Sequence, residues 1–136
     1  MARILALDFG QKRTGIAVTD ELQIIASGLT TINTNDLLGF LVDYTAKENI
    51  ELFLVGKPKQ MNNEDSQSEA FIAPFLEKLS NKFPNIPIQR EDERFTSKMA
   101  SQTIIDSGIK KKQRRNKALV DEISATIILQ SYLYKK

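Results

Sequence analysis

Short apolar runs along this chain alternate with segments in which apolar residues recur at helical spacing. Five runs have the composition of β-strands, at residues 3–8, 14–19, 25–32, 50–55 and 86–91. Four segments have a helical pattern, at residues 37–44, 71–79, 96–107 and 117–134. Short loops join the first three strands and helices join the last two, so we expect strands 1–3 to be antiparallel and strands 4–5 to be parallel. The pattern predicts a mixed five-stranded α/β sheet with helices on both faces, in one domain of residues 1–136.

Local signals set the expected ends of these elements. Residues 33–36 can cap the first helix, and Ser66 to Glu69 match the capping box of the second, which should end near Phe83. Pro87 favours an edge position or the strand start for the fifth run.

Composition removes several kinds of chemistry. The chain has no histidine and no cysteine, so it cannot form a Ser-His-Asp triad, a zinc site of the usual ligands or a thiol nucleophile. Residues 1–55 carry four Lys and Arg against seven Asp and Glu, whereas residues 56–136 carry fifteen against ten. The basic second part indicates an anionic partner such as nucleic acid. No apolar stretch approaches about 18 residues, so we expect a cytoplasmic protein without a membrane segment.

Acidic residues stand at three points that such a sheet can bring together. Asp8 ends the first run, Asp92 and Glu93 follow the fifth, and Asp121 lies on the small-residue face of the last helix. On two adjacent strand ends and a covering helix, these acids can hold one or two Mg²⁺ or Mn²⁺ ions, which activate water for phosphodiester cleavage. The alternatives are that Asp8 caps a turn and that Asp121 pairs with Lys117.

Four motifs carry a close resemblance to a known family: L-D-F-G-x-K-R-T-G-I-A-V-T-D, V-G-K-P-x-x-M, D-E-R-F-T-S and D-x-x-S-A-x-x-I-L-Q-x-Y-L, at residues 7–20, 55–61, 92–97 and 121–133. They resemble the YqgF or RuvX family over essentially the whole chain. The resemblance implies a ribonuclease H-like fold and a bacterial cytoplasmic nuclease that matures the 5′ end of 16S ribosomal RNA. It carries the family's acids to Asp8, to Asp121 and to the pair Asp92 and Glu93. Of that pair we favour Glu93 as the metal ligand, because its side chain is longer.

Basic residues near these acids are candidate substrate contacts. Arg13 and Arg94 stand close to the acids in sequence and can bind phosphate or stabilise the transition state. Lys57 belongs to the loop that follows the fourth strand. The run of residues 110–117 is either a solvated surface or a clamp on the nucleic-acid backbone. Its candidate contacts are Lys110, Lys111, Lys112, Arg114 and Arg115.

These observations leave three functions open. The leading hypothesis is a metal-dependent endonuclease acting on structured RNA, with a ribosome precursor as partner. A Holliday junction resolvase would use the same acids on branched DNA and would require a symmetric dimer, whereas the first function is compatible with a monomer or a homodimer. The third possibility is an RNA-binding or ribosome-binding module whose acids no longer support turnover.

Overall fold

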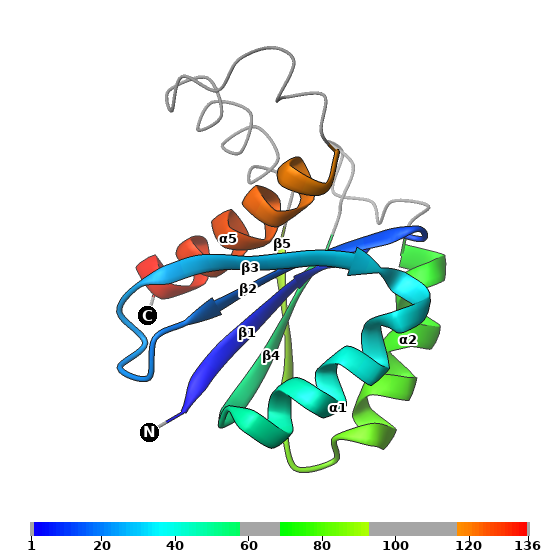
Figure 1. The fold of residues 1–136 in the computed structure, drawn as a ribbon, viewed down its shortest axis with the longest axis horizontal. Helices are drawn as coiled ribbons and strands as arrows, with labels where there is room; N and C mark the ends of the chain where they lie inside the picture. Colours follow the sequence, from blue (N-terminus) through cyan, green and yellow to red (C-terminus); the bar gives the residue numbers. More distant parts are fainter. Residues whose placement is uncertain (1, 58–68, 93–116, 136) are drawn as a thin grey trace.

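A computed structural model describes residues 2–57, 69–92 and 117–135, and at residues 57, 69, 92, 117–121 and 135 the backbone alone. The described elements are β1 (Arg3–Asp8), β2 (Arg13–Thr19), β3 (Ala26–Asn33), the 3₁₀ turn η1 (Thr34–Asp36), α1 (Leu37–Lys47), β4 (Ile50–Lys57), α2 (Glu69–Lys82), β5 (Ile88–Asp92) and α5 (Lys117–Lys135) (Figure 1). None of the helices within these residues is long and apolar enough to cross a membrane.

The five strands form one sheet in the order β3-β2-β1-β4-β5. β1 pairs antiparallel with β2, and β2 with β3, whereas the β1–β4 and β4–β5 pairs are parallel. The predicted mixed sheet is therefore confirmed. Because β1, β4 and β5 run in the same direction, their last residues lie along one side of the sheet, which we call the carboxyl edge.

The order of the strands corrects one expectation. β4 lies between β1 and β5, so the acids that end β1 and β5 are not on adjacent strands. The sequence of β4 contains the run LFLV, in which Phe53, Leu54 and Val55 are fully buried, and this places it inside the sheet rather than at its border. β5 takes the outer position, and Pro87 directly precedes it, as the proline predicted.

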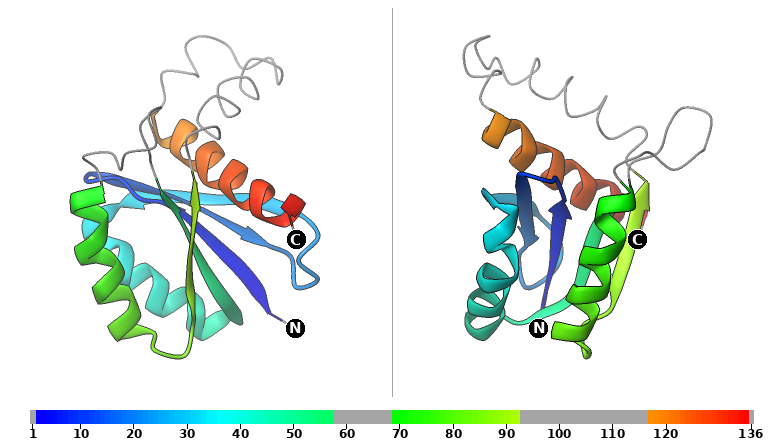
Figure 2. Two further views of the ribbon diagram at one scale, coloured as in Figure 1. Left: turned by 180° about the vertical axis from the view of Figure 1, so that it is seen from behind. Right: turned by 90° about the vertical axis from the view of Figure 1, so that its right-hand side faces the viewer.

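Alternate residues of the central strands face two separate cores. In β1, Leu5 and Leu7 belong to a cluster with buried residues of α1 and α2, whereas Ile4 and Ala6 belong to a cluster with buried residues of α5. Figure 2 shows the same arrangement, with α1 and α2 on one face of the sheet and α5 on the other. Helices on both faces are confirmed. The period of two along β1 decides which face each residue meets, Asp8 included.

The described helices α1, α2 and α5 form where the apolar periodicity predicted them, although the expected side-chain cap of α1 is not formed. Leu37 and Leu41 are the buried residues of α1, one helical turn apart, and α2 ends at Lys82, before Phe83. Asp36 makes no side-chain cap hydrogen bond to α1, because η1 supplies a tighter turn at this point. The predicted helix at residues 96–107, the capping residue Ser66 and the basic run all lie outside the described residues.

Candidate functional site

The carboxyl edge carries three of the predicted site residues. Asp8 is the last residue of β1, and Lys57 and Asp92 are paired as the last residues of β4 and β5. Asp8 is half-buried. Since neighbouring strands are about 4.8 Å apart and β4 intervenes, the backbones of β1 and β5 are about 10 Å apart at this edge. A ligand that spans Asp8 and the end of β5 must therefore cross the end of β4.

The helix α5 covers this edge from one face of the sheet. One face of β1 packs against α5, in the cluster that contains Ala6, Ala125, Ile128 and Leu129. Asp8 is two residues after Ala6 in β1, so it faces the same side of the sheet. Residue 121 lies one turn before Ala125 on the same helical face. In Figure 1 the amino-terminal end of α5 lies on the side of the sheet toward which β4 and β5 run. The fold thus brings the positions of the first and third predicted acids to one region.

The other predicted site residues are only partly covered by the structure. Asp92, Asp121 and Lys57 are placed by their backbone, and the remaining candidates lie outside the described residues: Glu93, Arg94, Lys110, Lys111, Lys112, Arg114 and Arg115. Among the described residues, no three acidic side chains form a cluster that would hold a metal ion. The metal centre therefore stays a prediction.

The loop between β1 and β2 is fixed in place beside Asp8. The Thr34 hydroxyl donates a hydrogen bond to the Gly10 carbonyl, and the Thr34 amide donates to the Lys12 carbonyl at 3.0 Å. The hydroxyl oxygens of Thr14 and Thr34 lie 3.0 Å apart. A Cβ atom at Gly10 would come within 2.4 Å of a backbone carbonyl oxygen, so only glycine fits this turn.

Arg13 lies at the same edge of the sheet as Asp8. It begins β2, which runs antiparallel to β1, and Asp8 is paired with Gly15 two residues further along. Arg13 is half-buried, and Lys12 precedes it on the loop. This register places Arg13 at the same edge and on the same face of the sheet as the first predicted acid, as a phosphate contact requires.

A buried carboxylate in β5 was not predicted from the sequence. Glu91 has 5% of its surface exposed, and the Ser131 hydroxyl of α5 lies 3.3 Å from one of its carboxylate oxygens. The alternation of β5 carried no signal for it, because Gln89, which shares the face of Glu91, is exposed. Glu91 shows which face of β5 meets α5.

A small cavity opens at the carboxyl edge, on the face of the sheet that α2 covers. Its volume is about 110 Å³, and it lies between the β1–β2 loop and the first turn of α2. The described residues that line it are Phe9, Gly10, Gln11, Phe71 and Ile72. Phe9, which follows Asp8 directly, stacks on Phe75 with 4.6 Å between the ring centroids. The carboxyl edge therefore adjoins an aromatic wall.

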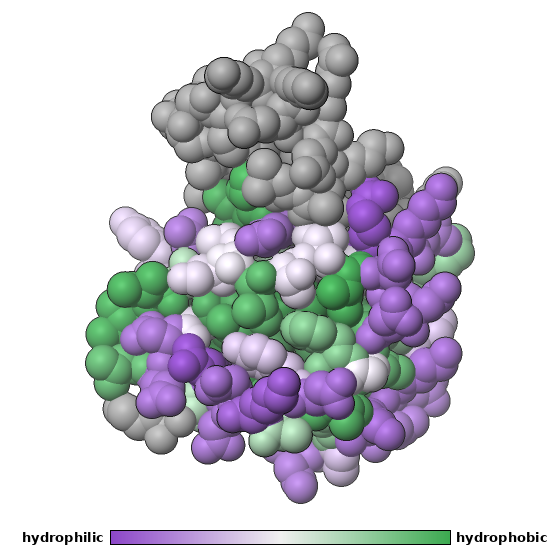
Figure 3. Space-filling view, in the orientation of Figure 1, coloured by the Kyte–Doolittle hydropathy of each residue, from purple (hydrophilic) through white to green (hydrophobic). Residues whose placement is uncertain are grey.

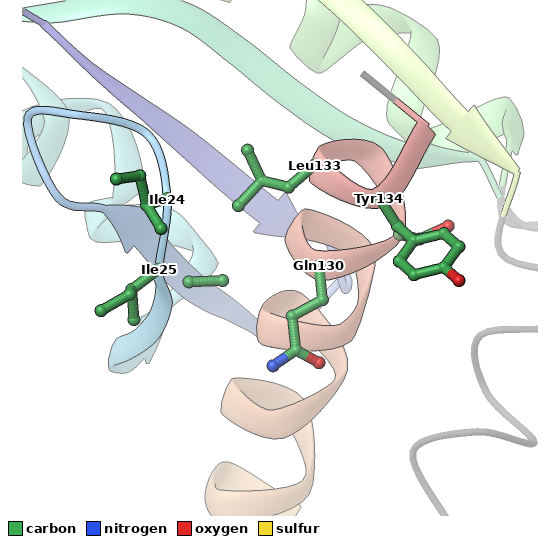
Figure 4. A pocket seen from close by; sticks show the side chains of 7 residues that line it. Ile24, Ile25, Gln130, Leu133 and Tyr134 are labelled. Atoms are coloured by element: carbon green, nitrogen blue, oxygen red, sulfur yellow. The ribbon is translucent and has the colours of Figure 1, made fainter.

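A larger groove lies at the opposite edge of the sheet, where β1 begins. It has a volume of about 710 Å³ and separates the β2–β3 loop from the carboxyl-terminal end of α5. Figure 4 shows Ile24 and Ile25 across from Leu133 and Gln130, and Figure 3 shows apolar side chains gathered at this end of the molecule. No carboxylate or basic group is among the described lining residues, so this groove lacks the chemistry for hydrolysis.

Comparison with known proteins identifies relatives of the same length. The family model described as RuvX, Holliday junction resolvase, matches residues 2–135. A protein of Flavobacterium psychrophilum is 66% identical over 136 residues, which cover 100% of this chain and 99% of the relative. A protein of Christiangramia forsetii is 64% identical over 135 residues, 99% of this chain and all of the relative. Both carry a name that describes a nuclease for pre-16S ribosomal RNA.

Two solved structures share the fold at low sequence identity. T. thermophilus RuvC in complex with a Holliday junction substrate matches with a TM-score of 0.62 and 14% identity, over 99% of this chain and 95% of that one. Fowlpox virus resolvase with Holliday junction DNA matches with a TM-score of 0.61 and 14% identity, over 98% and 97%. These likenesses confirm the ribonuclease H-like fold.

Proposed function

Because this chain belongs to the RuvX family and is a nuclease, we propose that it cleaves pre-16S ribosomal RNA in the maturation of the 5′ end. The observation that carries the proposal is the 66% identity over the full chain to a relative whose name describes this activity. The fold supports it, since Asp8 and the backbone positions of Asp92 and Asp121 lie around one edge of the sheet.

The residues at this edge fit a divalent metal by the chemistry of their donors. In the proposed site, Asp8, Glu93 and Asp121 hold one or two Mg²⁺ or Mn²⁺ ions, which prefer carboxylate oxygens. Bound ions supply Lewis-acid activation of water and stabilise charge on the leaving oxygen.

The basic residues have two roles in this proposal. Arg13, beside Asp8, holds the phosphate that is cleaved, and Arg94 stabilises the charge that develops on it. Lys57, at the end of β4, contacts the adjoining phosphate. The lysines and arginines at residues 110–115 neutralise phosphates further along the RNA and make binding dependent on salt.

The charge change Asp8→Asn tests the proposal against a matched control. The substrates are a 5′ fragment of pre-16S RNA and a four-way DNA junction, each with Mg²⁺ or Mn²⁺. Cleavage of the RNA should fall by more than about a hundredfold in Asp8→Asn, because loss of even an outer-shell partner of a metal ligand costs 10–100-fold. The control Asp20→Asn makes the same change on the loop at the opposite edge and should cleave like wild type.

Three outcomes would contradict parts of this proposal. Equal cleavage by wild type and Asp8→Asn would reject the carboxylate mechanism. Cleavage of the junction but not of the RNA, by a protein that elutes as a dimer, would assign the resolvase activity instead. RNA binding without any cleavage under either metal would leave a binding module.

A further inference from the structure

The ring of Phe71 is the starting observation. Phe71 is the third residue of α2, and it is 51% exposed, whereas Ile72 and Phe75 on the same helix are buried. Single exposed apolar residues are common on protein surfaces. Phe71 differs from the other exposed apolar side chains because it lines the cavity at the carboxyl edge. Leu22, Ile24, Ile25 and Tyr134 belong to the opposite end of the sheet or of α5, and Leu29 and Val42 lie on β3 and α1.

The shape of the cavity fits one flat aromatic group. Its volume of about 110 Å³ is on the scale of a single ring system and not of a whole nucleotide. Its floor is rigid, since Phe9 is stacked on Phe75 and Ile72 is 1% exposed. Gly10 lets the backbone of the loop approach closely, and the exposed Gln11 offers an amide at the rim. A flat group with polar edges matches these walls.

We propose that this cavity binds one unpaired nucleobase of the substrate, stacked on the ring of Phe71, close to the carboxyl edge at which the phosphate is cleaved. The inference rests on the proposed nuclease function and adds a specificity for unpaired nucleotides. Continuity with the carboxyl edge supports this occupant, because the loop that lines the cavity begins directly after Asp8, although the cavity opens on the α2 face and Asp8 faces α5. The positive charges of Lys12 on the same loop and of Arg13 at the start of β2 complement the backbone to which such a base is attached.

The geometry predicts which substrates the site accepts. A base within a continuous duplex is stacked on both sides and cannot lie against Phe71 without leaving the helix. Single-stranded segments and strand ends present their bases without this cost, and stacking of each on an aromatic side chain strengthens binding. The enzyme should therefore prefer a cleavage position next to an unpaired nucleotide.

A fluorescent base reports the contact without any cleavage. Short RNAs carry 2-aminopurine either next to the cleavage position or several nucleotides away, and binding is followed in EDTA. The chain has no tryptophan, so its own emission does not interfere. With wild type and the conservative variant Phe71→Tyr, stacking should quench the probe that is next to the cleavage position. Phe71→Ala should abolish this quenching and weaken binding about tenfold, while a fully paired duplex binds unchanged.

A matched control and the separate outcomes complete the test. Tyr134→Ala removes an aromatic ring at the far end of α5 and should bind like wild type. Quenching by Phe71→Ala equal to that of wild type would overturn the proposal, even if the RNA is cleaved. Quenching that depends on Phe71 in a protein that cleaves no RNA would support the base pocket and reject the nuclease function.

Discussion

Replacing Thr34 with valine removes two hydrogen bonds that hold the β1–β2 loop. The Thr34 hydroxyl donates to the Gly10 carbonyl, so the Thr14 hydroxyl donates to Thr34. Loss of the first bond costs about 0.5–1.5 kcal/mol. Thr14 has no exposed surface, so its hydroxyl then remains buried without this acceptor, at a further cost of about 1–3 kcal/mol. We expect Thr34→Val to lower the free energy of unfolding by about 1.5–4.5 kcal/mol.

The double variant separates the two contributions. When Thr14→Val is already present, no hydroxyl is left buried, and Thr34→Val should cost only about 1 kcal/mol. Urea unfolding followed by far-ultraviolet circular dichroism measures each variant. Thr45→Val is the control, because its hydroxyl bonds to the Leu41 carbonyl within α1, and it should change stability by less than about 0.5 kcal/mol. Costs that add to within about 0.5 kcal/mol would refute the reasoning.

Three further predictions address other parts of the molecule. A hydrogen bond from the backbone amide of Ile25 is the main cause that holds the pKa of Asp20 below its usual 3.8. The ionised Asp20 therefore contributes stability above about pH 4, and this contribution is lost as the pH falls through the lowered pKa. Urea midpoints of wild type and Asp20→Asn, measured across pH, should differ above about pH 4 and converge below it. A Cβ atom at Gly28 would lie 2.5 Å from a carboxylate oxygen of Glu122, so Gly28→Ala should displace this flexible side chain and lower stability by about 0.5 kcal/mol, and Glu122→Ala should remove this cost in the double variant. Replacing the three lysines of residues 110–112 with alanine should weaken RNA binding and lower its salt slope by about 3, and an unchanged slope would remove them from the binding surface.

The strands could be predicted from the sequence because each central strand is a continuous apolar run with clear ends. Asp8 is the first polar residue after the run ILAL, and it ends β1. The position of β4 between β1 and β5 could not be predicted, because it depends on pairing between residues far apart in the chain. The partial burial of β3, by contrast, follows from its border position in the sheet.

The sequence could predict only those parts of the candidate site that depend on a single residue and its neighbours in the chain. The acid at Asp8 was visible as a carboxylate after an apolar run, and Arg13 followed from the hairpin. The burial of Glu91 depends on Ser131, forty residues away, and the cavity at Phe71 depends on a loop that is more than fifty residues away in the chain. Such features arise when α5 and α2 pack on the sheet, and no local pattern encodes them.

The unequal size of the two cores has a consequence for heat inactivation. Within residues 2–57, 69–92 and 117–135, the cluster under α1 and α2 contains twelve buried residues, whereas the cluster under α5 contains seven, three of which are alanines. Because less apolar surface is buried under α5, this helix should detach from the sheet at a lower temperature than that at which the sheet itself unfolds. Because α5 carries Asp121, one of the proposed metal ligands, the enzyme would lose activity reversibly while most of its strands stay protected from hydrogen exchange.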